Sequence, residues 1–424
     1  MSVQPSVAQA FRFADAFYED STAILRYALD DGVEFVERIR FPGAEGDPSG
    51  ALLELLHLIV GVSYYKTAAP QLEVDADPTT ADLLNRLYVD GLSEFAYVNR
   101  VDLRGRVRFA PAGDAAGDAL SLPRRTAVPI GGGKDSIVTL EALKRAGEPI
   151  VAFSVGNPDP IRRTVEAAGV EHIVVERELS PALFRLNAAG ALNGHVPITA
   201  IVSAIAFFAA PLYGFDAVAM SNERSASEPN LVWNGLEVNH QWSKGLQFER
   251  LFRACLAQRA PGLEWFSLLR PWSELAIGRA FAQLDGYDQA FTSCNSVFRR
   301  DPARRGTGWC GECPKCRFVF LVLAPWMEPD RLVRIFGRKL LDEPEQEAGF
   351  AELLGIEAHK PFECVGEEGE SAAALALLSE RPDWRDAHVV RALARATADA
   401  GALLEPSADH CIPARFEGAA RALL

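Results

Sequence analysis

The sequence predicts an α/β protein with a central parallel sheet, an α+β N-terminal domain over residues 1–122 and a helical C-terminal region over residues 329–424. Between these parts, across residues 123–328, short β-rich runs alternate with helical runs, which is typical of βαβ units. Helices between such runs would cover both faces of a parallel sheet. A length of 424 residues is consistent with two or three domains of ordinary size.

The first 122 residues are expected to combine a β-hairpin with helices. Alternating residues at 23–29 and 33–41 flank Asp30-Asp31-Gly32, a glycine-bearing turn of the kind that hairpins favour. Further along, Asp77-Pro78-Thr79 is a helix start signal. The other segments predicted here are helices at 52–60 and 83–95 and a linker at 111–118.

The middle region is expected to hold five buried strands. The helix after the first strand is predicted at 136–146, because Gly147 then ends the helical pattern. Residues 198–215 carry no charge over 18 residues, but Pro211 and Gly214 interrupt them, so a buried helix is predicted in preference to a membrane span. The strands are expected at 127–130, 149–155, 172–176, 217–220 and 266–269.

Charge and composition exclude several classes of protein. Hydrophobic residues make up 49% and charged residues 24%, as in an ordinary soluble globular protein. A net charge of −14 disfavours binding to nucleic acid or to an anionic membrane surface, and no obligate protein partner is evident. Since the N-terminus lacks the features of a signal peptide, a cytoplasmic protein is expected, in which cysteines are more often metal ligands or reactive thiols than disulfides.

A glycine-rich loop is the most informative stretch. Pro129-Ile-Gly131-Gly132-Gly133-Lys134-Asp135-Ser136 follows a predicted strand and opens a helix, so it can present backbone N–H groups to an anion. It is not a Walker A loop, because Val128 occupies the first glycine position, and it is not a dinucleotide fingerprint, because Ser136 replaces the last glycine. An ordinary tight turn between strand and helix is the alternative.

Four of the seven cysteines are clustered. Cys294 precedes Cys310, Cys313 and Cys316, which form two overlapping C-x-x-C units. Four thiolates suit tetrahedral zinc in a closed, structural site. An iron–sulfur cluster or reduced structural thiols are the alternatives. The three isolated cysteines, for which burial is the default expectation, are Cys255, Cys364 and Cys411. Cys364 also lies in an unusual run with Lys360 and Glu363, for which an ordinary loop is expected and an acid–base site is the alternative.

The glycine loop resembles the PP-loop of ATP pyrophosphatases, usually S-G-G-x-D-S, with Gly131 in place of the serine. The resemblance implies a PP-loop (adenine nucleotide alpha hydrolase-like) sheet and cleavage of ATP between its α and β phosphates. It implies that Asp135 helps place Mg²⁺ and that Lys134 neutralises developing charge. The cysteine arrangement is similar to the zinc site of the 7-cyano-7-deazaguanine synthases. The residues that would bind ATP are Gly131, Gly132, Gly133, Lys134, Asp135, Ser136, Phe153 and Ser154.

Across the whole chain, the sequence resembles the UDP-N-acetylmuramoyl-L-alanyl-L-glutamate epimerases. The motifs that carry this resemblance are Ser63-Tyr64-Tyr65-Lys66, the glycine loop, Ser221 to Ala226, Asn239-His240-Gln241, the cysteine cluster and Lys360 to Gly366. The family inverts the terminal L-Glu of a UDP-linked muramoyl dipeptide in peptidoglycan synthesis, uses ATP and Mg²⁺, and releases AMP and pyrophosphate.

We hypothesise roles in this chemistry for several polar residues. Glu223 or His240 would transfer the α-proton, with Lys360 and Lys66 as further candidates, and Lys66 is also placed at the substrate. Asn222, Arg224 and Lys244 would bind the substrate. The cations expected to make a locally basic cleft on an acidic protein are Lys134, Arg224, Lys244 and Lys360. The alternatives are another PP-loop adenylating enzyme, such as a deazaguanine ligase or a tRNA-thiolating enzyme, and a nucleotide-binding module without catalysis.

Overall fold

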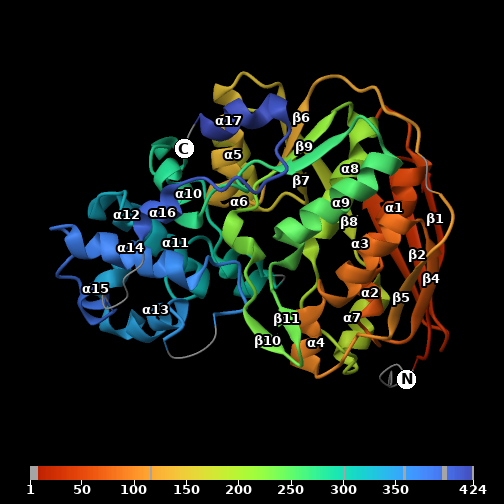
Figure 1. Cartoon of the computed structure of the whole chain (residues 1–424), viewed down its shortest axis with the longest axis horizontal. Helices are drawn as coiled ribbons and strands as arrows, with labels where there is room; N and C mark the ends of the chain where they lie inside the picture. The colour runs from red at the N-terminus through yellow and green to blue at the C-terminus, as the bar shows by residue number, and fades with distance from the viewer. Residues whose placement is uncertain (1–7, 115–116, 300, 357–359, 394–398, 423–424) are drawn as a thin grey trace.

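A computed structural model describes residues 8–114, 117–299, 301–356, 360–393 and 399–422. It contains an eight-stranded sheet that runs through the wider half of the molecule (Figure 1), in the order β1-β2-β3-β8-β7-β6-β9-β12. The predicted α/β class is confirmed, because the last five strands in this order are parallel to one another. The bounds are β1 Phe11–Glu19, β2 Thr22–Leu29, β3 Glu34–Arg40, β6 Thr126–Pro129, β7 Ile150–Val155, β8 His172–Glu178, β9 Ala217–Met220 and β12 Glu264–Ser267.

The predicted N-terminal hairpin is confirmed as β2 and β3, which pair antiparallel on either side of Gly32 with φ +87°. Strand β1 was not predicted. Its pairing with β2 shifts register between Phe13 and Ala16, and this irregularity interrupts the alternation by which a strand is recognised. Strand β3 also pairs antiparallel with β8, so the hairpin extends the parallel sheet.

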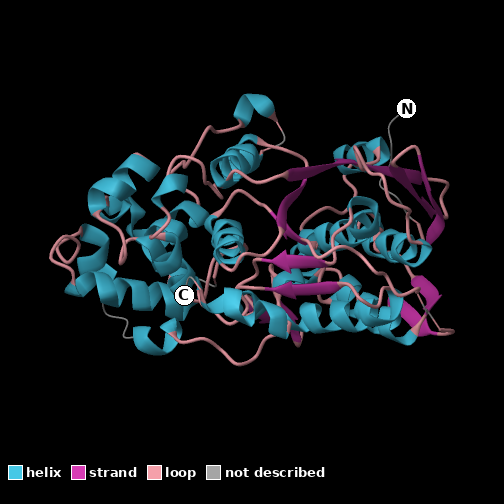
Figure 2. Cartoon of the chain, turned by 90° about the horizontal axis from the view of Figure 1, so that it is seen from above, coloured by secondary structure: helices cyan, strands magenta, loops and turns pink. Residues whose placement is uncertain are grey.

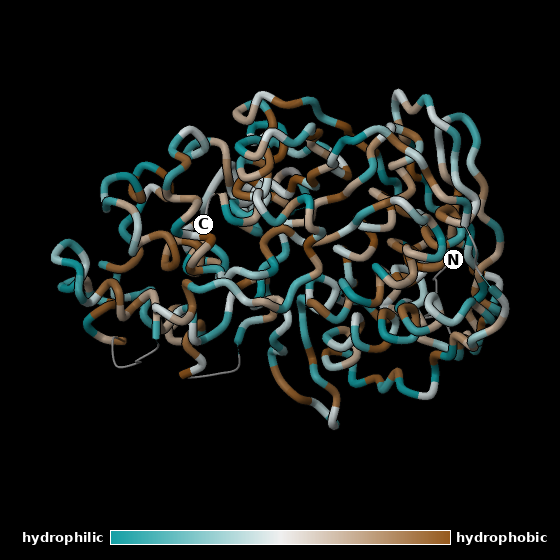
Figure 3. Tube along the Cα trace, turned by 45° about the horizontal axis from the view of Figure 1, so that its top comes forward, coloured by the Kyte–Doolittle hydropathy of each residue, from teal (hydrophilic) through white to brown (hydrophobic). Residues whose placement is uncertain are grey.

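Side chains of the parallel strands alternate between two hydrophobic cores. Ala127 of β6 and Val218 of β9 belong to one core, whereas Val128 and Ala219 belong to the other. This alternation follows from the period of two in a strand, and it requires helices on both faces. The brown segments that cross the interior in Figure 3 are consistent with this burial.

Helices cover both faces of the sheet, as Figures 1 and 2 show. The predicted buried helix at 198–215 is confirmed as α8, which contains Pro211 and packs in the core shared with the N-terminal hairpin. Of the helices within the described ranges, none is long and apolar enough to cross a membrane. Helices with residues in that core are α1 Gly50–Val60, α2 Val62–Tyr65, α3 Pro78–Val89, α4 Ser93–Asn99, α7 Pro181–Ala188, α8 Ile198–Tyr213 and α9 Leu246–Arg259.

The second core joins the other face of the sheet to the helical C-terminal region, which confirms the helical prediction for that region. The chain finally returns to the sheet, where Trp272 Nε1 donates to the carbonyl of Ala420 (3.2 Å) and α17 lies beside α5 (Figure 1). Helices with residues in this core or packed against it are α5 Lys134–Arg145, α6 Asp159–Ala168, α10 Glu274–Phe281, α11 Pro314–Leu323, α12 Pro329–Phe336, α13 Glu347–Leu353, α14 Glu368–Glu380, α15 His388–Leu393, α16 Ala400–Leu404 and α17 Glu417–Arg421.

Some predicted boundaries differ from the structure. The last parallel strand was expected at 266–269 but is β12 at Glu264–Ser267, because the chain turns at 268–271 beyond the pairing with β9. Helix α5 begins at Lys134, two residues earlier than expected, so the glycine loop leads directly into it. Four short strands in two small sheets were not predicted. They are β4 Leu72–Ala76 with β5 Val107–Pro111, and β10 Leu231–Trp233 with β11 Leu236–Val238.

A buried ion pair fixes the junction between the hairpin and the parallel sheet. Glu37 on β3 is fully buried and accepts hydrogen bonds from Arg177 Nε (2.7 Å) on β8 and from the hydroxyl of Tyr64 (2.5 Å). We expect Glu37→Gln to lower the thermal unfolding midpoint, because removing one charge of a buried pair costs about 3 kcal/mol or more. Glu34→Gln, on the exposed face of the same strand, is the matched control. Equal midpoints for the two variants would contradict this role for Glu37.

Candidate functional site

The glycine loop lies at the carboxyl end of β6 and is closely packed. Gly132 has φ +81°, and a Cβ atom there would lie 2.9 Å from Cβ of Pro160. Gly133 is the N-cap of α5, and no side chain caps this helix start. Backbone N–H groups in the first turn of a helix have no partner within the helix, so this loop can bind an anion such as a phosphate.

The loop that follows β9 lies beside the glycine loop. Strands β6 and β9 are neighbours, and the chain order reverses between them, which is where open α/β sheets bind ligands. Three successive residues after β9 carry buried polar atoms that have no hydrogen-bond partner among the described residues: Ser221 Oγ, Asn222 Nδ2 and Glu223 Oε2. Buried polar groups are seldom left unpaired. These atoms therefore indicate a place where a polar ligand binds.

Three carboxylates converge between the two loops. One carboxylate oxygen from each of Asp135, Glu223 and Glu274 lies within 4.8 Å of the others, and Lys134 forms ion pairs with Asp135 and Glu274. Burial raises the pKa of Glu274 well above its usual value, and Asp135 and Glu223 add to this effect against the opposing charge of Lys134. The excess of negative charge and the oxygen ligands are features that Mg²⁺ sites share.

A second polar cluster holds a thiol, two imidazoles and a carboxylate. His240 is hydrogen-bonded through Nδ1 to Glu94 and also to Cys364, and the His195 ring lies 4.3 Å from the His240 ring. Burial acts to raise the pKa of Cys364, but Lys244 and the hydrogen bond with His240 outweigh it and lower this pKa to about 6. We name Glu94, His195, His240 and Cys364 the thiol–imidazole cluster.

Lys244 connects the two clusters. Burial acts to lower its pKa, but the charges of Cys364 and then Glu223 outweigh it and raise this pKa. The pKa of Glu223 is lowered in the same way, because the charge of Lys244 outweighs burial, which acts to raise it. The glycine loop and the thiol–imidazole cluster therefore belong to one continuous polar site.

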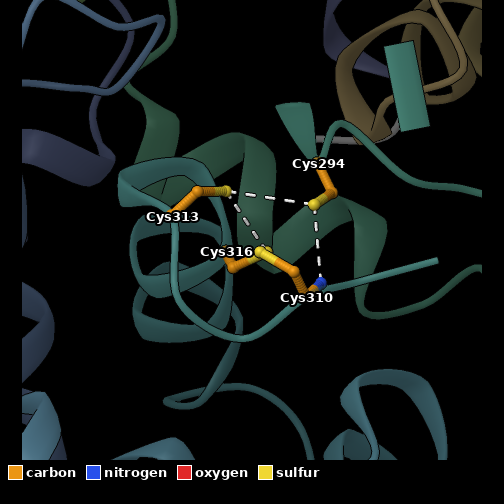
Figure 4. A group of neighbouring side chains, drawn as sticks. All are labelled: Cys294, Cys310, Cys313 and Cys316. Carbon is orange, nitrogen blue, oxygen red and sulfur yellow. Dashed lines mark hydrogen bonds between the residues drawn. The ribbon is translucent and has the colours of Figure 1, made fainter. Parts of the chain in front are cut away.

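The four clustered cysteines point toward a common centre (Figure 4). Their sulfur atoms lie 3.4 Å apart between Cys313 and Cys316, 3.7 Å between Cys310 and Cys316, and 4.0 Å between Cys294 and Cys313. Tetrahedral zinc with bonds of about 2.3 Å places its sulfur ligands roughly 3.8 Å apart. Backbone N–H groups of Cys310 and Glu312 donate to two of these sulfurs, as surrounding groups do in metal sites. The group can hold a tetrahedral metal.

The predicted site residues fall into different surroundings. Asn222, Glu223 and Lys244 lie with the glycine loop, as described above. Ser154 Oγ donates to the carbonyl of Gly156 (2.7 Å) and contacts His172, whereas the Phe153 side chain is fully buried against Phe215. Only their backbone is therefore available to a nucleotide in this structure.

The remaining predicted residues lie at the edges of the site. Lys66 is buried, donates to Asn193 and to the carbonyl of Gly194, and its charge acts on His195. Arg224 donates to the carbonyls of Leu403 and Glu405. Lys360 is buried and lies shortly before Cys364 in the sequence. Burial raises the pKa of Glu367, and the charges of Lys360 and Arg224 act to lower it.

Sequence reasoning missed two members of the thiol–imidazole cluster, Glu94 and His195, and considered an acid–base role for Cys364 only as the alternative to an ordinary loop. Glu94 and His195 belong to no motif, and Cys364 was expected to be an ordinary buried cysteine, whereas it is partly exposed, as is Cys411. Cys255 is buried as expected, against Thr80. The one available signal was the unusual run from Lys360 to Gly366, which places a Lys, a Glu and a Cys close together in the chain.

Comparison with known proteins identifies the family. The MurL N-terminal domain matches residues 2–268, and the MurL C-terminal domain matches residues 290–407. The chain belongs to the MurL family. A relative in Micromonospora sp. is 48% identical over 92% of this chain and 92% of its own length. Relatives in Salinispora tropica and Xanthomonas oryzae pv. oryzae are each 46% identical, over 97% and 91% of this chain and 95% and 89% of their own lengths.

All three relatives are named UDP-N-acetyl-alpha-D-muramoyl-L-alanyl-L-glutamate epimerase. The resemblance to this epimerase family that the sequence predicted is confirmed, and so is the isomerase class at the level of the MurL family. The use of ATP, the PP-loop type of the sheet, the metals and the individual site roles stay predictions.

His240 is expected to titrate far above an ordinary histidine. Burial acts to lower its pKa, but the hydrogen bonds with Cys364 and Glu94 outweigh it and raise this pKa to about 9. Since an unfolded histidine has a pKa of about 6.5, the stabilisation is complete below that pH and is lost as the pH rises through 9. Histidine NMR titration should find one ring with a pKa near 9, and Glu94→Gln should lower it.

Glu237→Gln is the matched control for this titration, because Glu237 is exposed on β11, three residues before His240. It should leave the His240 titration unchanged. An unperturbed pKa for His240 in the wild-type protein, or equal shifts in both variants, would exclude the hydrogen-bonded arrangement.

Proposed function

We propose that this MurL-family protein inverts the terminal L-Glu of UDP-N-acetylmuramoyl-L-Ala-L-Glu to D-Glu, in a reaction that uses ATP and proceeds through an acyl-adenylate. The observation that carries this proposal is the convergence of the uncapped glycine loop with the three carboxylates of Asp135, Glu223 and Glu274. An epimerase needs no such site for the inversion alone. A site for phosphate and a divalent cation is explained by activation of a carboxylate with ATP.

The glycine loop is assigned to the phosphates of ATP. The N–H groups at the start of α5 would bind the anion, and the close contact between Gly132 and Pro160 leaves no room for a side chain. The parallel strand order β8-β7-β6-β9-β12 places this loop at the reversal point of the sheet and supports the PP-loop assignment. Lys134 lies next to the same position and would offset charge on the departing pyrophosphate.

Asp135, Glu223 and Glu274 would hold Mg²⁺. Glu223 Oε2 is buried without a hydrogen bond, and the neighbouring carboxylates raise the pKa of Glu274 after burial itself, so a divalent cation would relieve both effects. When bound, Mg²⁺ supplies charge neutralisation for the phosphate oxygens of ATP.

Adenylation explains how the α-proton of glutamate becomes removable. Beside a free carboxylate, the enolate formed by proton loss would carry two negative charges. An acyl-adenylate has no such charge, and its carbonyl accepts the electrons of the broken C–H bond. A base on one face then removes the α-proton, a proton is added on the other face, and hydrolysis releases the inverted product with AMP. Glu223, His240 and Lys360 are the predicted proton-transfer candidates.

The four clustered cysteines are assigned to a structural zinc. Their spacing supports a closed tetrahedral site, which leaves no position for a substrate. The cluster lies beside the glycine loop, since the N–H of Thr292, two residues before Cys294, donates to the carbonyl of Gly132 (2.8 Å). Zinc would therefore support the glycine loop.

The central test is an assay with ATP, Mg²⁺ and the UDP-linked dipeptide. We expect AMP release that requires the dipeptide, and D-Glu in the product. Asp135→Asn should lower this activity about 10²-fold or more, because it removes an anionic ligand of the metal. Asp159→Asn, at an exposed position at the start of α6, is the matched control and should retain activity. Inversion at the full rate without ATP would refute the adenylation route.

Metal analysis tests the cysteine site. We expect about one zinc per chain by inductively coupled plasma mass spectrometry, since four thiolates make one closed site. Cys316→Ser should lose zinc and unfold at a lower temperature, whereas Cys411→Ser, outside the cluster, should retain both metal and stability. Stoichiometric iron with visible absorbance would replace the zinc assignment with an iron–sulfur cluster.

A further inference from the structure

Three side chains of the thiol–imidazole cluster form a chain of hydrogen bonds. Cys364 is hydrogen-bonded to His240, and Nδ1 of His240 is hydrogen-bonded to Glu94, which lies on α4. Glu94 and His240 expose 13% and 14% of their side chains, and Cys364 is partly exposed. A thiol, an imidazole and a carboxylate in this order is the arrangement that activates a thiol by proton transfer to the imidazole.

Hydrogen bonds on both sides fix the thiol against the imidazole. Asn230 Nδ2 donates to the carbonyl of Pro361 (2.9 Å), and its Oδ1 accepts from the N–H of His240 (2.9 Å). Gln241 Nε2 donates to the carbonyl of Val365 (3.1 Å). These hydrogen bonds therefore connect the segment that carries Cys364 to the segment that carries His240, on both sides of Cys364 in the sequence.

The charges around the cluster favour a thiolate beside an imidazolium. Lys244 and Lys315 face Cys364 together with His240, whereas Glu94 and His195 face His240 and the charge of Lys66 acts on His195. These cations outweigh the effect of burial and bring the pKa of Cys364 to about 6, so the thiol is ionised at neutral pH.

We propose that the thiolate of Cys364 removes the α-proton of the activated glutamate from one face, with His240 and Glu94 as positioning residues. This role rests on the proposed epimerase function. The proton passes from Cα to Sγ, and the electron pair of the C–H bond moves into the enolate of the acyl-adenylate. The opposite face then takes a proton of solvent origin, and Cys364 returns its proton to solvent through His240.

The proposed metal site favours Cys364 over Glu223 as this base. The charge of Lys244 acts on both groups, so Cys364 and Glu223 both lie near its ammonium. Glu223 is needed as a metal ligand in the proposed function, and a metal-bound carboxylate is a poor base. Cys364 has no such competing role among the described contacts.

The first experiment separates adenylation from proton transfer. Cys364→Ala and Cys364→Ser are compared with the wild-type protein for pyrophosphate release in a single turnover and for exchange of the substrate α-proton in deuterated water. We expect pyrophosphate release within a few fold of wild type and α-proton exchange lowered by 10² or more. Cys411→Ser is the matched control and should exchange at the wild-type rate.

The outcomes distinguish this proposal from the function on which it rests. A wild-type protein that releases no pyrophosphate with the dipeptide contradicts the proposed function. Wild-type exchange in a folded Cys364→Ala variant overturns the role of Cys364 and leaves the proposed function intact. Loss of pyrophosphate release together with exchange in a folded variant overturns it as well, because Cys364 would then serve binding or adenylation.

The second experiment uses the unaltered cysteine and does not depend on how the variants fold. The rate of iodoacetamide alkylation at Cys364 is followed by peptide mass spectrometry across pH, with Cys411 in the same protein as the internal reference. We expect a midpoint near pH 6 at Cys364 and a midpoint above that of a free thiol at Cys411, where burial raises the pKa. His240→Gln should raise the Cys364 midpoint. A midpoint near 8.5, the value of a free thiol, overturns the proposal.

Discussion

The geometry of the polar site depends on one buried guanidinium, that of Arg270. It forms an ion pair with Glu249 (2.9 Å), and it also donates to the carbonyls of Glu223 (2.5 Å) and Lys244. Arg270 and Glu249 are almost completely buried, so neither charge can be compensated by water if its partner is lost. The guanidinium therefore fixes the backbone at the two residues whose side chains join the carboxylates to the thiol–imidazole cluster.

The planar shape of the guanidinium explains why an arginine suits this position. A guanidinium has five N–H donors in a rigid fork, whereas a lysine has one rotating ammonium. Three acceptors from different segments are satisfied here at once, and Glu249 uses its second oxygen to accept from the N–H of Ser267 (3.0 Å) on β12. These hydrogen bonds thereby fix β12, α9 and the loops that carry Glu223 and Lys244 relative to one another.

The cysteine cluster holds the opposite side of the site. Thr292, just before Cys294, donates to the glycine loop, and Asn295, just after it, donates to Glu363 beside Cys364. A short segment therefore contacts both the loop assigned to ATP and the segment that carries the thiol. The four cysteine sulfurs can stabilise this part of the chain where regular secondary structure is missing, because residues 282–313 contain only short 3-10 turns in their described parts.

Features set by residues adjacent in the sequence were predictable, whereas features that form only when distant segments pack together were not. The buried strands, the hairpin turn at Gly32 and the glycine loop are local patterns, and the structure contains them. Strand β1 was missed because its bulge breaks a local pattern. The thiol–imidazole cluster has no local pattern beyond the run from Lys360 to Gly366, since Glu94, His240 and Cys364 are each more than 100 residues from the next and meet only through the packing of α4 and the 360–366 segment.

Under the proposed function, the separation of the two clusters has a chemical reason. Activation of a carboxylate with ATP requires a site rich in anionic ligands for a metal, whereas removal of an α-proton by a thiolate requires cations that keep the thiol ionised. One small cavity cannot favour both conditions. Lys244 lies between them and stabilises the charge on each side, lowering the pKa of Glu223 and of Cys364 against the effect of burial. The net charge of −14 therefore says little about this site, where single cations at fixed positions set the ionisation of each group.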